Sequence, residues 1–214
     1  MNIKKITCNP LQENCYVVSD DSRECVIIDC GVYYEQERIA IVDYIRDNGL
    51  KPVHLLATHG HLDHNFGNDT LYDEFKLQAE VMAEDLYLAE HLPKQAMDYF
   101  GMEINEQQPP LGPCLSDGAL VRFGRHAFQV IHTPGHTPGS VVFWCREESV
   151  AFTGDTLFRM SIGRTDLDGG NWQQMAQSLQ KIAAILPADT KIFAGHGPES
   201  TMADELQFNP YMRG

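Results

Sequence analysis

The feature that most constrains the fold is a dense group of polar residues directly after a short apolar run. Val53–Thr58 reads VHLLAT, which is typical of a buried strand. The next six residues, from His59 to His64, include three histidines and one aspartate. Neutral imidazoles and carboxylates bind zinc and other first-row metals, and side chains can converge where a strand ends. This order of residues predicts a metal site at the end of a strand.

Three further residues of ligand type follow other strand-like runs. His136 lies in a loop that contains two prolines and two glycines. Asp155 and His196 each come shortly after an apolar run, at Val150–Thr153 and Lys191–Ala194 respectively. Functional residues concentrate on loops that a rigid scaffold carries. We therefore expect these three residues to belong to the same site.

Short strands and amphipathic helices alternate along the chain. We expect helices at Glu35–Asn48, Asn68–Phe75, Glu84–Phe100 (kinked or broken at Pro93) and Trp172–Leu186, the last capped by Asn171. We expect strands at Asn2–Thr7, Cys15–Ser19, Cys25–Asp29, Val53–Thr58, Gln78–Ala83, Leu120–Phe123, Ala127–His132, Ser140–Cys145, Val150–Thr153 and Lys191–Ala194. The pattern predicts an α/β (α+β) sandwich with its sheets inside and its helices outside. No boundary is visible, so we expect one domain over residues 1–214.

The composition of the chain indicates which binding partners and which cellular compartment to expect. The net charge of −14 disfavours binding to nucleic acid or to anionic membrane surfaces. The sequence has no apolar run of signal-peptide length and none near the ~18 residues of a membrane helix. The six cysteines include no C-x-x-C pair and are expected to be reduced thiols. We expect a cytoplasmic protein, either monomeric or dimeric.

The polar residues resemble the signature of the metallo-β-lactamase superfamily. Its H-x-H-x-D-H motif is matched by His59, His61, Asp63 and His64. The later His, Asp and His of the family are matched by His136, Asp155 and His196. The resemblance spans residues from about 10 to 210. It implies an αββα sandwich with two mixed sheets and a centre of two divalent metal ions.

The resemblance also implies a role for each ligand. The first metal would be held by His59, His61 and His136, and the second by Asp63, His64 and His196, with Asp155 bridging the two. Zinc is the expected metal, with iron or manganese as alternatives. The metals would share a nucleophilic hydroxide, which Asp63 would orient.

Two loop segments resemble the glyoxalase II group more narrowly. They are Gly154–Phe158 with Ser161–Asp166, and Gly195–Thr201, which is similar to short bacterial glyoxalase II-like proteins. This resemblance implies hydrolysis of a small-molecule hydroxyacyl thioester of the S-lactoylglutathione type. Because the chain stops soon after His196, we expect no C-terminal helical domain of the kind that holds glutathione in full-length glyoxalase II. The thiol part of the substrate therefore stays open.

Other activities of the same fold remain alternatives. Gly163–Asp166 and His132–Gly139 also resemble segments of persulfide dioxygenases, which use a single ferrous ion. A lactonase is a further alternative. The acidic charge argues against a ribonuclease, and the lack of a secretion signal argues against a periplasmic β-lactamase.

Two cationic residues are candidates for substrate contacts. Arg164 could bind a substrate carboxylate, or it could brace its loop in a buried pair with Asp166. Lys94 lies in the helical stretch that begins at Glu84, which either covers the mouth of the site as a lid or only packs against the rest of the fold. Its ammonium is a candidate partner for an anionic part of the substrate.

Overall fold

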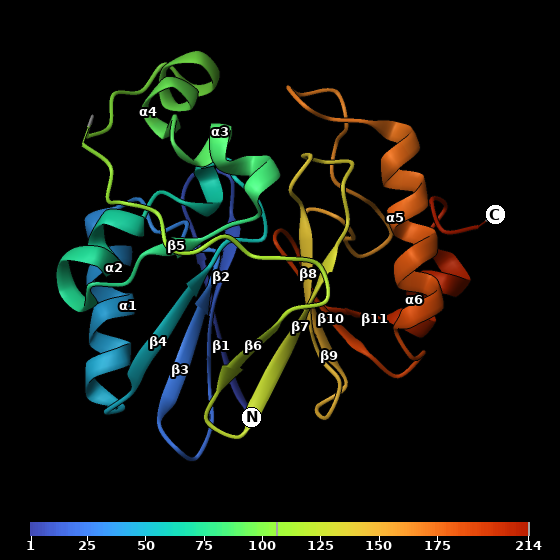
Figure 1. Ribbon diagram of the computed structural model, residues 1–214, viewed down its shortest axis with the longest axis horizontal. Coiled ribbons are helices and arrows are strands. Elements are labelled where there is room, and N and C mark those ends of the chain that lie inside the picture. Colours follow the sequence, from blue (N-terminus) through green and yellow to red (C-terminus); the bar gives the residue numbers. More distant parts are fainter. Residues whose placement is uncertain (106, 214) are drawn as a thin grey trace.

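The computed structural model describes residues 1–105 and 107–213. The expected domain runs from residue 1 to residue 214, so Glu106 and Gly214 lie outside the described residues. Within them, the chain forms two β-sheets that pack face to face (Figure 1).

The first sheet has five strands in sequence order. β1 pairs with β2 and β2 with β3 in antiparallel fashion, whereas β3–β4 and β4–β5 are parallel pairs. The strands are β1 (Asn2–Cys8), β2 (Glu13–Ser19), β3 (Glu24–Ile28), β4 (Lys51–Leu56) and β5 (Ala79–Glu80).

The second sheet has six strands in the order β11-β10-β9-β8-β7-β6. Only the β9–β10 pair is parallel. The strands are β6 (Leu120–Phe123), β7 (His126–His132), β8 (Val141–Cys145), β9 (Val150–Gly154), β10 (Lys191–Ala194) and β11 (Ser200–Thr201).

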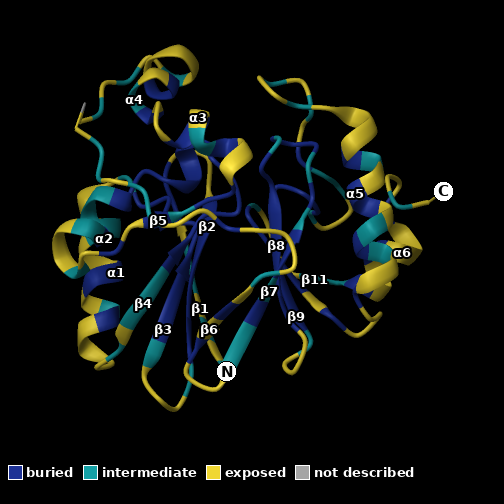
Figure 2. Ribbon diagram, in the orientation of Figure 1, coloured by how far each residue is buried: buried dark blue, intermediate teal, exposed yellow. Residues whose placement is uncertain are grey.

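Helices cover the outer face of each sheet. α1 (Glu35–Asp47) and α2 (Asn68–Phe75) flank the first sheet, and α5 (Trp172–Ile185) and α6 (Met202–Phe208) flank the second (Figure 1). Each helix buries an apolar face: Ile41 and Ile45 of α1 join the cluster under the first sheet, and Met175 and Ile182 of α5 join the cluster under the second. Figure 2 shows the buried strands between helices whose outer faces are exposed.

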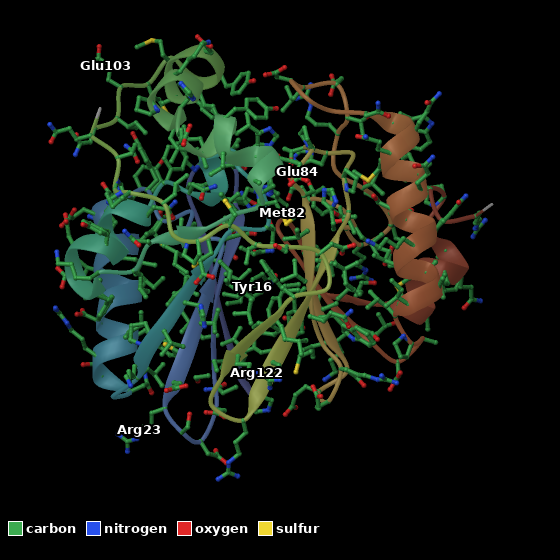
Figure 3. The ribbon with its side chains drawn as sticks, viewed as in Figure 1. Tyr16, Arg23, Met82, Glu84, Glu103 and Arg122 are labelled. Carbon is green, nitrogen blue, oxygen red and sulfur yellow. The ribbon has the colours of Figure 1, made fainter. Side chains whose placement is uncertain are left out.

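The main core lies between the two sheets. Val26 and Ile28 of β3 meet Phe128 of β7 and Phe152 of β9 there, and all four are fully or almost fully buried. Tyr16 of β2 points into this layer in Figure 3, and its hydroxyl donates a hydrogen bond to the Ala194 carbonyl at 2.7 Å. Burial of apolar side chains is the dominant stabilising term of such a core, and this polar contact ties the inner faces together.

The expected αββα sandwich with two mixed sheets is confirmed. The helical stretch expected at Glu84–Phe100 is broken next to Pro93, as predicted, and it divides further than expected. Its parts are α3 (Leu86–Ala89), α4 (Leu92–Gln95) and the π-helical turn Ala96–Phe100, after the 3-10 turn Ala83–Asp85. Pro93 lies in the first turn of α4, where its missing N–H is tolerated. The expected strand Gln78–Ala83 was too long: β5 covers only Ala79–Glu80, and Met82 forms an isolated bridge with Leu115. The helix α6 was not predicted.

Two chemical expectations can be compared with the structure. None of the helices within residues 1–105 and 107–213 combines the length and apolar character needed to cross a bilayer. All six cysteines are free, and five of them are buried.

One histidine links the two sheets in a pH-dependent manner. The His54 Nδ1 atom of β4 lies 2.6 Å from the Glu80 carboxylate, and Nε2 lies 3.2 Å from the Arg122 carbonyl of β6. The hydrogen bond to Glu80 raises the pKa of His54, although partial burial opposes it. The raised pKa means that protonated His54 stabilises the fold below about pH 6.5. This contribution is lost as the pH rises through the raised value.

We expect His54→Gln to cost about 0.5–1 kcal/mol at pH 5.5, which is the range for partly exposed ion pairs, and less at pH 8.5. Urea unfolding at the two pH values measures the difference. His91→Gln is the control, because His91 is exposed and contacts only the Tyr87 carbonyl of its own segment. An equal loss for His54→Gln at both pH values would contradict the expectation.

Candidate metal centre

The structure brings all seven predicted ligands to one end of the two sheets. His59, His61, Asp63 and His64 follow β4, and the last two lie in the 3-10 turn Leu62–His64. The other three follow strands of the second sheet: His136 follows β7, Asp155 follows β9 and His196 follows β10. The first sheet therefore supplies four of the side chains and the second supplies three.

The donor atoms form two groups that could each hold a metal ion. Ligand atoms of His59, His61 and His136 lie within 4.8 Å of one another, and the same holds for Asp63, His64 and His196. These are the two sets that the family resemblance implies.

Asp155 lies between the two groups. Its Oδ1 atom is 3.4 Å from His64 Nε2, while its Oδ2 atom is 3.5 Å from His136 Nε2 and 3.6 Å from His196 Nε2. One carboxylate thus faces a histidine of each set, which is the position that a bridging ligand needs.

Unpartnered polar atoms show that the residues fit metal ions. Among the described residues, eight buried side-chain polar atoms have no hydrogen-bond partner, and four of them belong to predicted ligands: Nε2 of His59, His61 and His64, and Oδ1 of Asp155. Leaving a buried polar atom unpaired costs about 1–3 kcal/mol. A set of neutral imidazole nitrogens and carboxylate oxygens that lacks other partners suits divalent metals of the first row.

Two of the histidines have their Nδ1 atom held by a main-chain carbonyl. His136 Nδ1 lies 2.7 Å from the Arg164 carbonyl, and His196 Nδ1 lies 3.1 Å from the Leu11 carbonyl. A hydrogen bond from Nδ1 to a carbonyl leaves the lone pair of Nε2 facing the centre, which orients each ring for metal binding.

Burial and neighbouring charges set the protonation of the centre. Burial, reinforced by the surrounding histidines, lowers the pKa of His59 far below its usual value and that of His61 to about 3. These rings are therefore neutral at pH 7, as metal binding requires. Burial alone would raise the pKa of Asp63, but His64 and His196 outweigh it and lower that pKa. Asp63 is accordingly ionised at pH 7.

Asp29 is a supporting residue that sequence reasoning did not single out. Its carboxylate accepts hydrogen bonds from the Thr58 amide and hydroxyl, each at 2.7 Å, and lies 3.0 Å from His64 Nδ1. It thereby joins the end of β3 to the end of β4 and orients His64. Its signal in the sequence is its position at the end of an apolar strand, which the predicted ligands share.

Asp85 is a second supporting residue that was missed. It is fully buried and accepts hydrogen bonds from the Gly60 amide at 2.9 Å, the Thr137 hydroxyl at 2.6 Å and the Gly139 amide. It therefore connects the loop of the H-x-H-x-D-H motif to the loop that carries His136. No local pattern marks it, because both of its partner loops are distant in sequence.

Gly60 lies where the ligand loop packs against α3, and it does not adopt a positive φ angle. A Cβ atom at this position would lie 2.7 Å from Leu88 Cβ and 3.0 Å from the Asp85 carbonyl. Glycine is needed here because α3 packs directly against the ligand loop.

A cavity of about 550 Å³ opens above the donors. Arg164 lines it, but the Arg164–Asp166 pair is exposed rather than buried, with two hydrogen bonds of 2.7 and 2.8 Å. Lys94 is not part of the lining: it pairs with Asp98 and faces an adjoining groove. Substrate binding by either cation stays a prediction.

Comparisons with known proteins agree with this site. Residues 8–196 match the model of the metallo-β-lactamase superfamily. The chain is 36% identical to the hydroxyacylglutathione hydrolase GloC of Haemophilus influenzae over 99% of this chain and 98% of that one. It resembles the crystal structure of the BLEG-1 B3 metallo-β-lactamase with a TM-score of 0.91 and 33% identity, covering 100% of both chains. It resembles TTHA1623 in a di-iron-bound form with a TM-score of 0.85 and 36% identity, covering 97% and 99%.

The chain belongs to the metallo-β-lactamase superfamily, and it is a metal-dependent hydrolase of that class. Its His and Asp cluster suits divalent metal ions.

The Asp85 connection yields a stability prediction. In Asp85→Asn, an amide N–H replaces one acceptor oxygen, so one of the three donors loses its partner. We expect the free energy of unfolding to fall by about 1–3 kcal/mol in urea titrations of metal-free protein. Glu84→Gln changes charge in the same way at an exposed neighbour and should stay within ~0.5 kcal/mol of the parent. Equal effects of the two substitutions would show that Asp85 does not support the loops.

Proposed function

We propose that the protein hydrolyses small hydroxyacyl thioesters of the S-lactoylglutathione type, giving a hydroxy acid and a thiol. The observation that carries the proposal is the donor set of two groups around Asp155 at the floor of an open cavity. The identity to a hydroxyacylglutathione hydrolase over nearly the full length of both chains supports the choice of a thioester. We include in the proposal a cytoplasmic location and a small-molecule partner rather than a nucleic acid or a membrane.

The two groups of ligands and Asp63 would have different roles in the reaction. Two divalent ions, zinc or alternatively iron or manganese, would be held by the two groups, with Asp155 between them. When bound, they would make a water nucleophilic at neutral pH and polarise the thioester carbonyl.

Asp63 would orient the attacking water. Its Oδ2 atom lies 3.3 Å from His196 Nε2, and a carboxylate is ionised at neutral pH, so it can accept a hydrogen bond from that water. The water oxygen would form a bond to the carbonyl carbon and lose a proton to solvent, and collapse of the tetrahedral intermediate would break the C–S bond. The sulfur departs as a thiolate and takes up a proton from solvent, which is favourable because thiols have pKa values of about 8.5.

The test combines metal content with turnover. We expect about two metal ions per chain and cleavage of lactoyl thioesters of glutathione and of N-acetylcysteamine, followed by release of free thiol. Asp63→Asn should lower kcat/KM by about 10²-fold or more, as loss of a positioned acid–base group does. Asp21→Asn serves as the matched control, because Asp21 is exposed and lies in the turn between β2 and β3, which contributes no residue to the donors or to the cavity lining.

Other outcomes would support the alternatives. One iron per chain, oxygen uptake with glutathione persulfide and no thioester cleavage would replace the proposal with a persulfide dioxygenase. Hydrolysis of lactones without thioester cleavage would replace it with a lactonase.

A further inference from the structure

The walls of the cavity differ in chemistry from its floor. The floor consists of predicted ligands. Apart from Gly163, the remaining lining is almost entirely apolar or aromatic: Leu11, Leu62, Tyr99, Phe100, Phe158 and Leu167, together with Gln95 and Arg164. These walls come from the β1–β2 loop, the 3-10 turn Leu62–His64, α4, the π-helical turn and the loop after β9. A thiol group that leaves the metal centre must pass between them.

Gln95 offers no donor to a substrate. Its side-chain amide donates to the Gly60 carbonyl at 3.0 Å and to the Leu88 carbonyl at 2.9 Å, and its oxygen accepts from the Leu62 amide at 3.0 Å. A side-chain amide has two N–H donors, so both are already used inside the protein. Gln95 therefore fixes the ligand loop rather than recognising a carboxylate.

Arg164 is the only arginine or lysine in the lining, as far as residues 1–105 and 107–213 are concerned. Its guanidinium binds both carboxylate oxygens of Asp166. A substrate carboxylate would have to compete with this two-bonded partner. The guanidinium of Arg164 is thus already paired with a carboxylate of the protein.

The adjoining groove does not supply the missing positive charge. It shares Gln95 and Tyr99 with the cavity and contains one lysine, Lys94, against two aspartates, Asp98 and Asp168. Lys94 is paired with Asp98. An anionic tail that crossed Tyr99 would therefore meet a groove with an excess of negative charge.

Phe158 brings the apolar wall close to the donors. Its ring packs edge-on against His196 at a centroid distance of 5.9 Å. Phe100 and Leu62 also line the cavity, and they belong to one apolar cluster with Leu92 of α4. An apolar group attached to the scissile sulfur can therefore be buried against these side chains.

We propose that the site selects thioesters whose thiol part is apolar and uncharged, such as an arylmethyl or alkyl thiol, over thioesters of glutathione. This inference rests on the proposed function. The glutathionyl group carries two carboxylates and one ammonium, and a charge that loses water without gaining a partner is costly. The walls compensate none of these charges, whereas they bury an apolar thiol.

The test compares lactoyl thioesters that share the acyl group and differ only in the thiol. We expect kcat/KM for the benzyl mercaptan ester to exceed that for the glutathione ester at least tenfold, mainly through a lower KM. The N-acetylcysteamine ester, which is neutral but less apolar, should fall between them. Metal-loaded protein is used throughout.

A substitution in the cavity wall distinguishes an effect on substrate binding from an effect on the metal centre. Leu167→Ser should raise KM for the benzyl ester at least fivefold and change that for the glutathione ester by less than twofold. Leu206→Ser, at an exposed position on α6, is the matched control. The KM difference between the two esters is the readout, because damage to the metal centre would lower kcat for both.

The failures of the two proposals are distinguishable. Cleavage of all three esters with glutathione equal or preferred would overturn the inference and leave the thioester hydrolase intact. A loss above tenfold in Arg164→Ala that is confined to the glutathione ester would also overturn it, because it would show a carboxylate bound at Arg164. Cleavage of none of the esters would overturn the proposed function itself.

Discussion

The fold depends on the hydrogen bonds and ion pairs that stabilise the imidazole and carboxylate groups buried where the two sheets meet. Such groups destabilise a fold when they lose water without gaining hydrogen bonds or charge partners. Asp29 satisfies the Thr58 backbone and faces His64, and Asp85 satisfies the backbone of Gly60 and Gly139. Several atoms of the predicted ligands keep no hydrogen-bond partner: Nε2 of His59, His61 and His64, and Oδ1 of Asp155. Buried imidazole nitrogens and carboxylate oxygens without partners suit divalent metal ions.

The two sheets contribute to the centre in different ways. The motif after β4 is held by side chains, above all by Asp29 and Asp85. The rings from the second sheet are held by main-chain carbonyls, those of Arg164 and Leu11. β2 also ties the sheets together, because Asn14 donates to the Ala194 and Gly197 carbonyls that flank His196. Small shifts between the sheets would therefore move donors relative to one another.

The ligand residues and the layered fold could be predicted from the sequence because both have local signatures. Apolar runs of strand length mark the sheets, and polar residues after them mark the site. The supporting residues could not be predicted in this way: Asp85 acts on loops 25 and 52 residues away, and only the fold brings them together. The division of Glu84–Phe100 beyond the expected break at Pro93, and the exposure of the Arg164–Asp166 pair, likewise could not be predicted from local patterns.

The most direct test of the account is the crystal structure of the protein loaded with zinc or manganese, with the ions located by anomalous scattering. The account predicts two ions, each about 2.0–2.3 Å from the donor atoms of one group, with Asp155 contacting both. The Arg164 and Leu11 carbonyls should still hold His136 and His196. A single ion, ions bound away from these donors, or rings that must rotate away from their carbonyl partners to reach the metal would contradict it.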